Sequence, residues 1–305
     1  MAAIYLIWQT PGGFQGFVDI GMNDRKFVLF DWSLDYRSAT FWVVILGGLA
    51  NNLISYTSDQ TIIQRYMTTK DERSAARSIV VNGVICVVVS IVFYLIGTGL
   101  YTFFKTHPDA GFSSLERPDA IFPFYVVTQL PAGVAGLLIA ALFAATMSTI
   151  SSNINSISTS FTIDIYQHIR PTRLSSKHIL RVARWASFVS GIAGLLIALL
   201  MAQLKIQSLL DYFNIILGLL SGCIGGLFVM GIFFPTIGSK SATIGFVAGM
   251  LIVFYLHFYT QVSFLIFGFV SIAASVSVAL LFSILFKERP NHQNLTWESL
   301  QNKSK

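Results

Sequence analysis

A run of hydroxyl and amide side chains between residues 144 and 159 is the part of this sequence best suited to binding a ligand. Five of them follow the i, i+3, i+4, i+7, i+11 spacing that places residues on one face of a helix. They are Ser148, Ser151, Ser152, Asn155 and Thr159. Because hard cations prefer hydroxyl and carbonyl oxygens, this stripe indicates a site for a monovalent cation. The alternative is small-residue packing in which each hydroxyl bonds to a backbone carbonyl one turn back.

The apolar stretches that include and precede this stripe contain no charged residues. Residues 79–100 and 130–163 include no Asp, Glu, Lys or Arg, whereas proton-driven transporters usually need a titratable side chain inside the membrane. The predicted coupling ion is therefore one that neutral oxygens hold. The apolar stretches also offer no Ser/His pair, metal-ligand cluster or Asp dyad. The sequence thus predicts neither an enzyme nor a cofactor.

A second irregular segment covers residues 47–60. Paired glycines and paired asparagines, Gly47-Gly48 and Asn51-Asn52, follow a strongly apolar start and make poor helix. An opened helix inside a membrane is tolerated where it lines a cavity, and such helices form substrate sites in secondary transporters. The equal alternative is a close-packing glycine pair with Asn51 or Asn52 hydrogen-bonded to a neighbour.

The composition is that of a membrane protein. Of the 305 residues, 54% are hydrophobic and only 11% are charged, and the mean hydropathy is +0.68. Soluble domains carry about a quarter charged residues. In water, a chain with so few charged residues would expose more apolar surface than a soluble protein tolerates, so most of it must lie in lipid. A secreted disulfide scaffold, a cytosolic enzyme and a disordered regulator are all excluded.

An α-helix needs about 20 mostly apolar residues to cross the hydrocarbon core. Seven stretches meet this need: residues 40–57, 79–104, 130–165, 180–203, 208–235, 241–259 and 262–286. We therefore predict an all-α polytopic membrane protein with seven transmembrane helices in residues 40–286. Residues 1–39 are predicted to hold the end of a preceding helix and an extracellular loop, and residues 287–305 a cytoplasmic tail.

The basic residues orient the predicted bundle. Of the 20 Lys and Arg, 14 lie in residues 65–78, 165–184 and 287–305 or at Lys240. Because excess Lys and Arg mark the cytoplasmic side, we expect a multi-pass protein of the plasma (inner) membrane with its N-terminus outside and its C-terminus in the cytoplasm. The net charge of +6 then reports topology within a lipid bilayer and does not indicate a nucleic-acid partner.

Two segments resemble the sodium:solute symporter family, the group of the sodium–glucose, proline, iodide and sialic acid cotransporters. Residues 58–71 (SDQTIIQRYMTTKD) are close to the family's loop after its sixth core helix. Residues 140–149 (AALFAATMST) and 155–166 (NSISTSFTIDIY) resemble its eighth core helix. The start of the tenth helix at residues 211–214 (DYFN) also agrees, and the resemblance runs to about residue 286.

The resemblance implies a leucine-transporter-type fold with ten core helices in two inverted repeats. The first five predicted helices would be core helices six to ten, and the last two would be peripheral. The first repeat would be missing from this chain. A missing N-terminal half is therefore an expected partner, besides sodium and a small-molecule solute.

Carried onto this sequence, the family's sodium site takes the carbonyl of Ala145 and the hydroxyls of Ser148 and Thr149. A second sodium, bound by some members, would use Ser151 and Ser152. Its carboxylate would come from the missing repeat.

The resemblance also places a substrate site. Asn52 takes the place of a sugar-binding Asn, Ser55 and Tyr56 fall in the inner-gate region, and Asn214 replaces a sugar-contacting Gln. A Lys that contacts sugar in some members falls near Cys86, and these departures weaken a claim to glucose or galactose.

These expectations add up to sodium-coupled symport of a small polar solute, a sugar or sugar acid, by alternating access. Two alternatives stay open. One is a truncated, transport-inactive half-protein, and the other is a membrane sensor derived from the same family.

Overall fold

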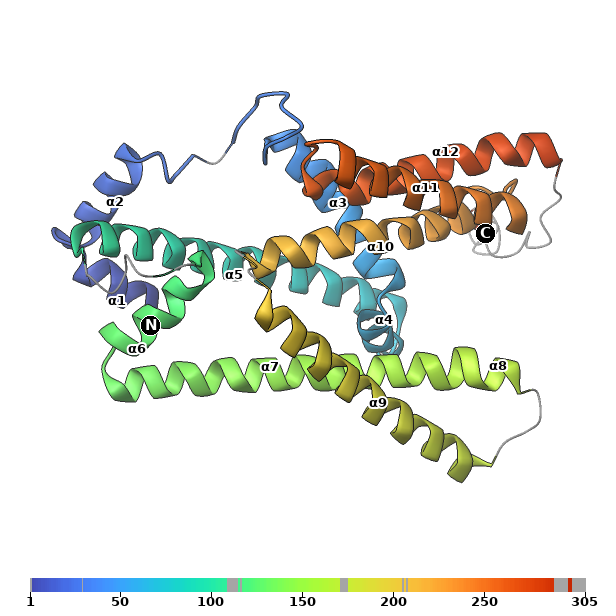
Figure 1. Ribbon diagram of the computed structural model, residues 1–305, viewed down its shortest axis with the longest axis horizontal. Helices are drawn as coiled ribbons and strands as arrows, with labels where there is room; N and C mark the ends of the chain where they lie inside the picture. The colour runs from blue at the N-terminus through green and yellow to red at the C-terminus, as the bar shows by residue number, and fades with distance from the viewer. Residues whose placement is uncertain are drawn as a thin grey trace. The chain divides into compact units, whose positions relative to one another are not determined.

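The computed structural model describes residues 2–28, 30–108, 115, 117–170, 175–204, 206, 208–287 and 296–297. Throughout these residues the regular structure is helical and no strand occurs, which confirms the all-α prediction for this part of the chain. The helices form two compact units. One comprises Met1–Phe27 with Gln64–Ser208, and the other Val28–Ile63 with Leu209–Lys305. Figure 1 labels the helices of both units.

The first unit is built on three long helices and several short ones. Their bounds are α1 Ala2–Gln9, α2 Gly13–Asn23, α5 Glu72–Thr106, η2 Pro118–Ala120, α6 Ile121–Gln129, α7 Ala132–Ser160, η3 Phe161–Tyr166, α8 Gln167–Ile169 and α9 Ser176–Gln203. The helix α4, Gln60–Met67, crosses the division between the units. Because η3 and α8 continue α7 directly, these three elements form one helical stretch of 38 residues.

The core of the first unit lies where α1 and α6 pack against the end of α5. Leu6 and Tyr125 are fully buried there beside Phe103 and Phe104. The Tyr125 hydroxyl donates a hydrogen bond to the Gln9 side-chain oxygen at 2.8 Å, so the polar end of the ring is satisfied inside an apolar cluster. This core therefore fixes the short helices on the last turns of α5.

An ion pair holds the end of α2 against α5. The Asp24 carboxylate accepts hydrogen bonds from the Lys105 ammonium and, at 3.1 Å, from the Tyr101 hydroxyl. The ammonium of Lys26 lies 4.0 Å from the centre of the Tyr101 ring. The hydrogen bond from Lys105, helped by the one from Tyr101, holds the pKa of Asp24 below its usual value.

We expect Asp24→Asn to loosen α2, and acidification to do the same in the unchanged protein. A carboxylate whose pKa is lowered by folding stabilises the folded state above its unfolded pKa, and that contribution is lost as the pH falls through the lowered value. Faster amide hydrogen exchange across residues 13–23 would report both effects. The matched control is Asp19→Asn, an exposed carboxylate on the same helix. Equal exchange rates in the two variants would contradict the prediction.

A π-helical turn, η3, connects α7 to α8. A π-helix bonds each residue to the fifth one before it, so the turn takes up one residue more than an α-helical turn. Helix α9 packs along this region. The Ser158 hydroxyl donates to the Ala183 carbonyl at 2.7 Å, and the Tyr166 hydroxyl lies 2.9 Å from the His178 ring nitrogen Nε2. The end of α7 and the start of α9 are thereby fastened together.

The second unit contains α3 Phe41–Ser58, α10 Leu209–Phe233, α11 Ser239–Tyr259, η4 Phe264–Ile266 and α12 Phe267–Phe286. Small residues let these helices approach closely. A Cβ placed on Gly245 of α11 would lie 2.3 Å from the Ser275 carbonyl oxygen of α12. The buried Ser271 hydroxyl of α12 lies 3.0 Å from the Cys223 sulfur of α10. The packing of α10, α11 and α12 therefore depends on the close approach of their backbones more than on the interlocking of large side chains.

Within the described residues, six helices are long and apolar enough to cross a membrane: α5, α7 with η3 and α8, α9, α10, α11, and η4 with α12. Each occupies one of the predicted stretches. The remaining stretch is the 18-residue α3, whose polar pair Asn51 and Asn52 lowers its hydropathy. The seventh span and the assignment of helices to inverted repeats stay predictions, as do the proposed boundaries of loop, membrane region and tail.

Helix α5 begins earlier than the apolar stretch from residue 79 suggests. Asp71 caps its N-terminus, because its carboxylate accepts a hydrogen bond from the backbone N–H of Ser74 at 2.7 Å. The bonds from Ser74 hold the pKa of Asp71 below its usual value. The polar first turns of α5 therefore belong to the helix although the hydropathy pattern omits them.

Candidate functional site

The predicted sodium ligands lie on one turn of α7. The Thr149 hydroxyl donates to the Ala145 carbonyl at 3.1 Å, so two of the three proposed ligands are in contact. Ser148 follows on the same turn and is exposed. A carbonyl and two hydroxyls on one helical turn offer three oxygen ligands of the kind a hard cation prefers.

The hydroxyls of the stripe fall into two groups. Those of Ser148, Ser151 and Ser152 bond to no other residue in the described part of the chain. By contrast, the Thr159 hydroxyl donates to the Asn155 carbonyl at 2.8 Å, and Ser158 is bonded to α9. The packing interpretation therefore applies to the end of the stripe. Its first half keeps its hydroxyls available to a ligand.

Thr146 is an exposed hydroxyl of the same helix that does not belong to the predicted ligands. Its hydroxyl donates to the Leu142 carbonyl at 2.8 Å, one turn back. Its position, two residues before Ser148, places it on a different face of α7 from the stripe. It is therefore a suitable internal control for the proposed ligands.

Of the two alternatives for Gly47-Gly48, the opened helix is wrong, because α3 runs unbroken from Phe41 to Ser58. Close packing is what the first glycine provides: a Cβ on Gly47 would lie 1.9 Å from the Leu265 carbonyl oxygen. The Asn52 amide nitrogen donates to the Gly48 carbonyl at 2.8 Å. The helix ends later, where Asp59 takes an extended conformation before α4.

The two predicted substrate amides are held in the same way. Asn214, in the first turns of α10, donates to the Leu210 carbonyl at 3.0 Å, as Asn52 does to Gly48. A carboxamide has two N–H donors and an acceptor oxygen. Each Asn therefore retains one donor and its acceptor for a solute that carries hydroxyl groups.

Ser55 and Tyr56 lie in the turn after Asn52 and are half-buried. Between them and Asn52, Ile54 is buried, with its Cγ1 2.5 Å from where a Cβ on Gly225 of α10 would stand. Helices α3 and α10 therefore touch at this level. The predicted substrate residues all belong to the second unit, and the predicted sodium ligands all belong to the first.

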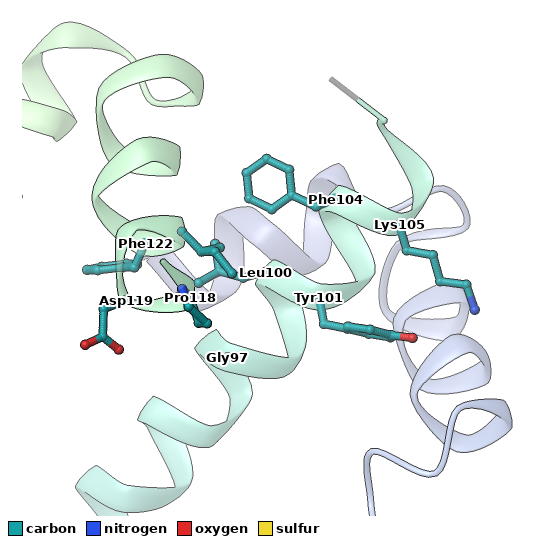
Figure 2. A pocket seen from close by; sticks show the side chains of 9 residues that line it. Gly97, Leu100, Tyr101, Phe104, Lys105, Pro118, Asp119 and Phe122 are labelled. Carbon is teal, nitrogen blue, oxygen red and sulfur yellow. The ribbon is translucent and has the colours of Figure 1, made fainter. Parts of the chain in front are cut away.

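A pocket in the first unit was not predicted. It has a volume of about 530 Å³ and lies between the end of α5 and the start of α6, as Figure 2 shows. Leu100, Phe104 and Phe122 are among its walls, and Lys105 and Asp119 also line it, with their charged ends on opposite sides in Figure 2. None of the predicted site residues lines it. Apolar side chains from two separate helices give no local signal that a sequence pattern could detect.

Comparison with known proteins gives a consistent result. The sequence model of the Sodium:solute symporter family matches residues 33–252. The sodium/sialic acid symporter SiaT of Proteus mirabilis (strain HI4320) is 30% identical over 287 residues, which are 93% of this chain and 57% of that protein. The sodium/sialic acid symporter NanT of Aliivibrio fischeri (strain ATCC 700601 / ES114) is 31% identical over 272 residues, 89% of this chain and 54% of NanT.

The fold agrees with the same group. A solved structure of a Na⁺-coupled sialic acid symporter, in a substrate-bound outward-open state, matches with a TM-score of 0.80 and 28% sequence identity. The match covers 93% of this chain and 58% of the solved one. The chain thus spans a little over half the length of these three relatives.

Proposed function

The chain belongs to the sodium:solute symporter family, and on that basis we propose that it carries out sodium-coupled symport of a small polar solute. The observation that carries this proposal is a set of hydroxyls on α7 that bond to no residue in the described ranges, those of Ser148, Ser151 and Ser152. They stand next to a carbonyl and a threonine hydroxyl on a helix without charged residues from Ala132 to Ile163. Sodium is a cation that such neutral oxygens hold.

In this proposal Ala145, Ser148 and Thr149 supply the sodium site from this chain, and Ser151 with Ser152 supply hydroxyls for a second ion. The N-terminus faces outside and the basic loops face the cytoplasm. Inward movement of one sodium ion yields about 2.3 kcal/mol per 100 mV of membrane potential. Sodium and solute favour each other's binding by one coupling free energy, which is reciprocal.

A sugar acid is the favoured class of solute. The relatives with the longest matches reported above are named as sialic acid symporters. A sugar acid presents many hydroxyl groups, which suit the free donor and acceptor atoms of Asn52 and Asn214. We assign Asn52 and Asn214 to solute binding, with Ser55 and Tyr56 at the inner end of the site.

The decisive experiment is uptake by the protein isolated from its native membranes. A C-terminal epitope shows the length of the polypeptide made there, and that polypeptide is reconstituted into liposomes. We expect labelled sialic acid to accumulate with an inward sodium gradient and not with potassium. A panel of neutral sugars and monocarboxylates as competitors ranks the solute class. Equal uptake in sodium and potassium would refute the proposal.

We expect Asn52→Ala to raise the KM for the solute about tenfold, since a lost hydrogen bond to a solute in an enclosed site costs about 1.4 kcal/mol. The sodium requirement at saturating solute should not change. Asn51→Ala is the matched control, because the Asn51 oxygen faces Gly268 of α12 within the second unit. An equal KM in the Asn52 variant and the unchanged protein would remove Asn52 from the solute site.

A further inference from the structure

A narrow apolar groove runs between the end of α7 and the first half of α9, within the first unit. Its volume is about 450 Å³. Most of its walls are apolar and largely exposed, with Ile157 and Phe161 on one side and Trp185 and Val189 on the other. Both flanking helices are long and apolar enough to cross a membrane. An open apolar groove on such helices has the shape and chemistry to hold a hydrocarbon chain.

One end of the groove is cationic. Arg181, in the second turn of α9, lines it together with Tyr166 of η3. Arg181 forms no ion pair with any described residue. The Arg170 guanidinium lies 5.7 Å from the centre of the Tyr166 ring, and the Tyr166 hydroxyl is already engaged with His178. The arginine at the mouth of the groove is therefore free to meet an anion.

The charge of the surrounding segment is strongly one-sided. Between residues 160 and 184 the sequence has five Lys and Arg and a single acidic residue, Asp164. Basic residues at the end of a membrane helix mark the level of the lipid headgroups, and Trp and Tyr prefer that same level. Tyr166 and Trp185 line the groove close to Arg181. The groove is therefore cationic at one end and apolar along its length, which matches the anionic headgroup and the apolar acyl chain of a phospholipid.

We propose that this groove binds an anionic phospholipid, with the acyl chain along Ile157, Phe161, Trp185 and Val189 and the headgroup phosphate on Arg181. Basic pockets between membrane helices on the cytoplasmic side recognise anionic headgroups by this combination of features. A zwitterionic lipid offers the same chain without net charge, and free phosphate offers the anion without a chain. Neither uses both ends of the groove.

Native mass spectrometry of the full chain in detergent tests the proposal without any transport assay. The probes are phosphatidylglycerol and phosphatidylcholine with identical acyl chains. We expect the unchanged protein to retain phosphatidylglycerol in preference, and Arg181→Gln to reduce that retention about fivefold, the effect of one Lys or Arg at an anionic membrane surface. Arg73→Gln, an exposed arginine in the first turn of α5, is the matched control and should change nothing.

A second variant tests the apolar end. Ala186 lines the groove, and Ala186→Trp should fill it and lower the retention of both lipids while Arg181 stays in place. Circular dichroism checks that the helices persist. The proposal is overturned if Arg181→Gln and Ala186→Trp retain phosphatidylglycerol like the unchanged protein. It is equally overturned if millimolar inorganic phosphate displaces the lipid, because the acyl chain would then contribute nothing.

Discussion

Ser148→Ala is expected to raise the sodium concentration for half-maximal uptake at least about tenfold, which corresponds to 1.4 kcal/mol of lost binding free energy. The Ser148 hydroxyl stands beside Thr149 and the Ala145 carbonyl and bonds to no described residue. Removing it deletes one oxygen ligand and breaks no internal hydrogen bond. The change should therefore act through the sodium site and leave the folded state intact.

The measurement is the sodium dependence of solute uptake in liposomes, with Thr146→Val as the control. Thr146 is also an exposed hydroxyl of α7, but it is bonded to Leu142 and lies off the stripe. Because the coupling is reciprocal, Ser148→Ala should also weaken solute binding at limiting sodium and restore it at high sodium. A sodium dependence equal to that of Thr146→Val would exclude Ser148 from the site.

Gly245→Ala should destabilise the second unit by about 1–3 kcal/mol, the usual cost of forcing extra atoms into a packed interface. The added Cβ would stand 2.3 Å from the Ser275 carbonyl oxygen and 2.7 Å from the Cβ of Ala279. A backbone carbonyl cannot swing aside as a side chain can. Helices α11 and α12 would have to separate to admit the methyl group.

Thermal unfolding of the detergent-solubilised protein, followed by circular dichroism, measures this cost. Gly231→Ala in α10 is the matched control, since a Cβ there meets nothing within 4 Å. That variant should be neutral, or stabilising by up to about 1 kcal/mol, because alanine is the better helix former. Equal unfolding temperatures in the two variants would contradict the close approach of α11 to α12.

The helices of this protein could largely be predicted from the sequence. The stretch predicted at 208–235 holds α10, Leu209–Phe233, and the one predicted at 241–259 holds α11, Ser239–Tyr259. Hydropathy succeeds here because the length of an apolar run is a local property that the bilayer alone demands. The early start of α5 could also have been predicted, because Asp71 is a favoured N-cap residue and Glu72 places an acidic side chain in the first turn.

Contacts between distant segments could not be predicted in this way. Whether Gly47 marks an opened helix or a close approach depends on the carbonyl of Leu265, which lies far along the chain. Spacing alone also could not show which hydroxyls of α7 have partners, because this depends on α9, which bonds Ser158 and leaves Ser148 exposed. The residue types of the proposed site could be predicted from the sequence, but their hydrogen-bond and packing partners could not.

The π-helical turn at Phe161–Tyr166 has a consequence for how the long helix is counted. Its additional residue delays the rotation of everything that follows, so the chain before and after it cannot be drawn on one helical wheel. In an unbroken α-helix, nine residues make two and a half turns, and Tyr166 would point away from Ile157. The turn instead brings both to the same groove. The additional residue of the π-helical turn thus lets one continuous helix carry the stripe of hydroxyls in its middle and an aromatic wall toward α9 at its end.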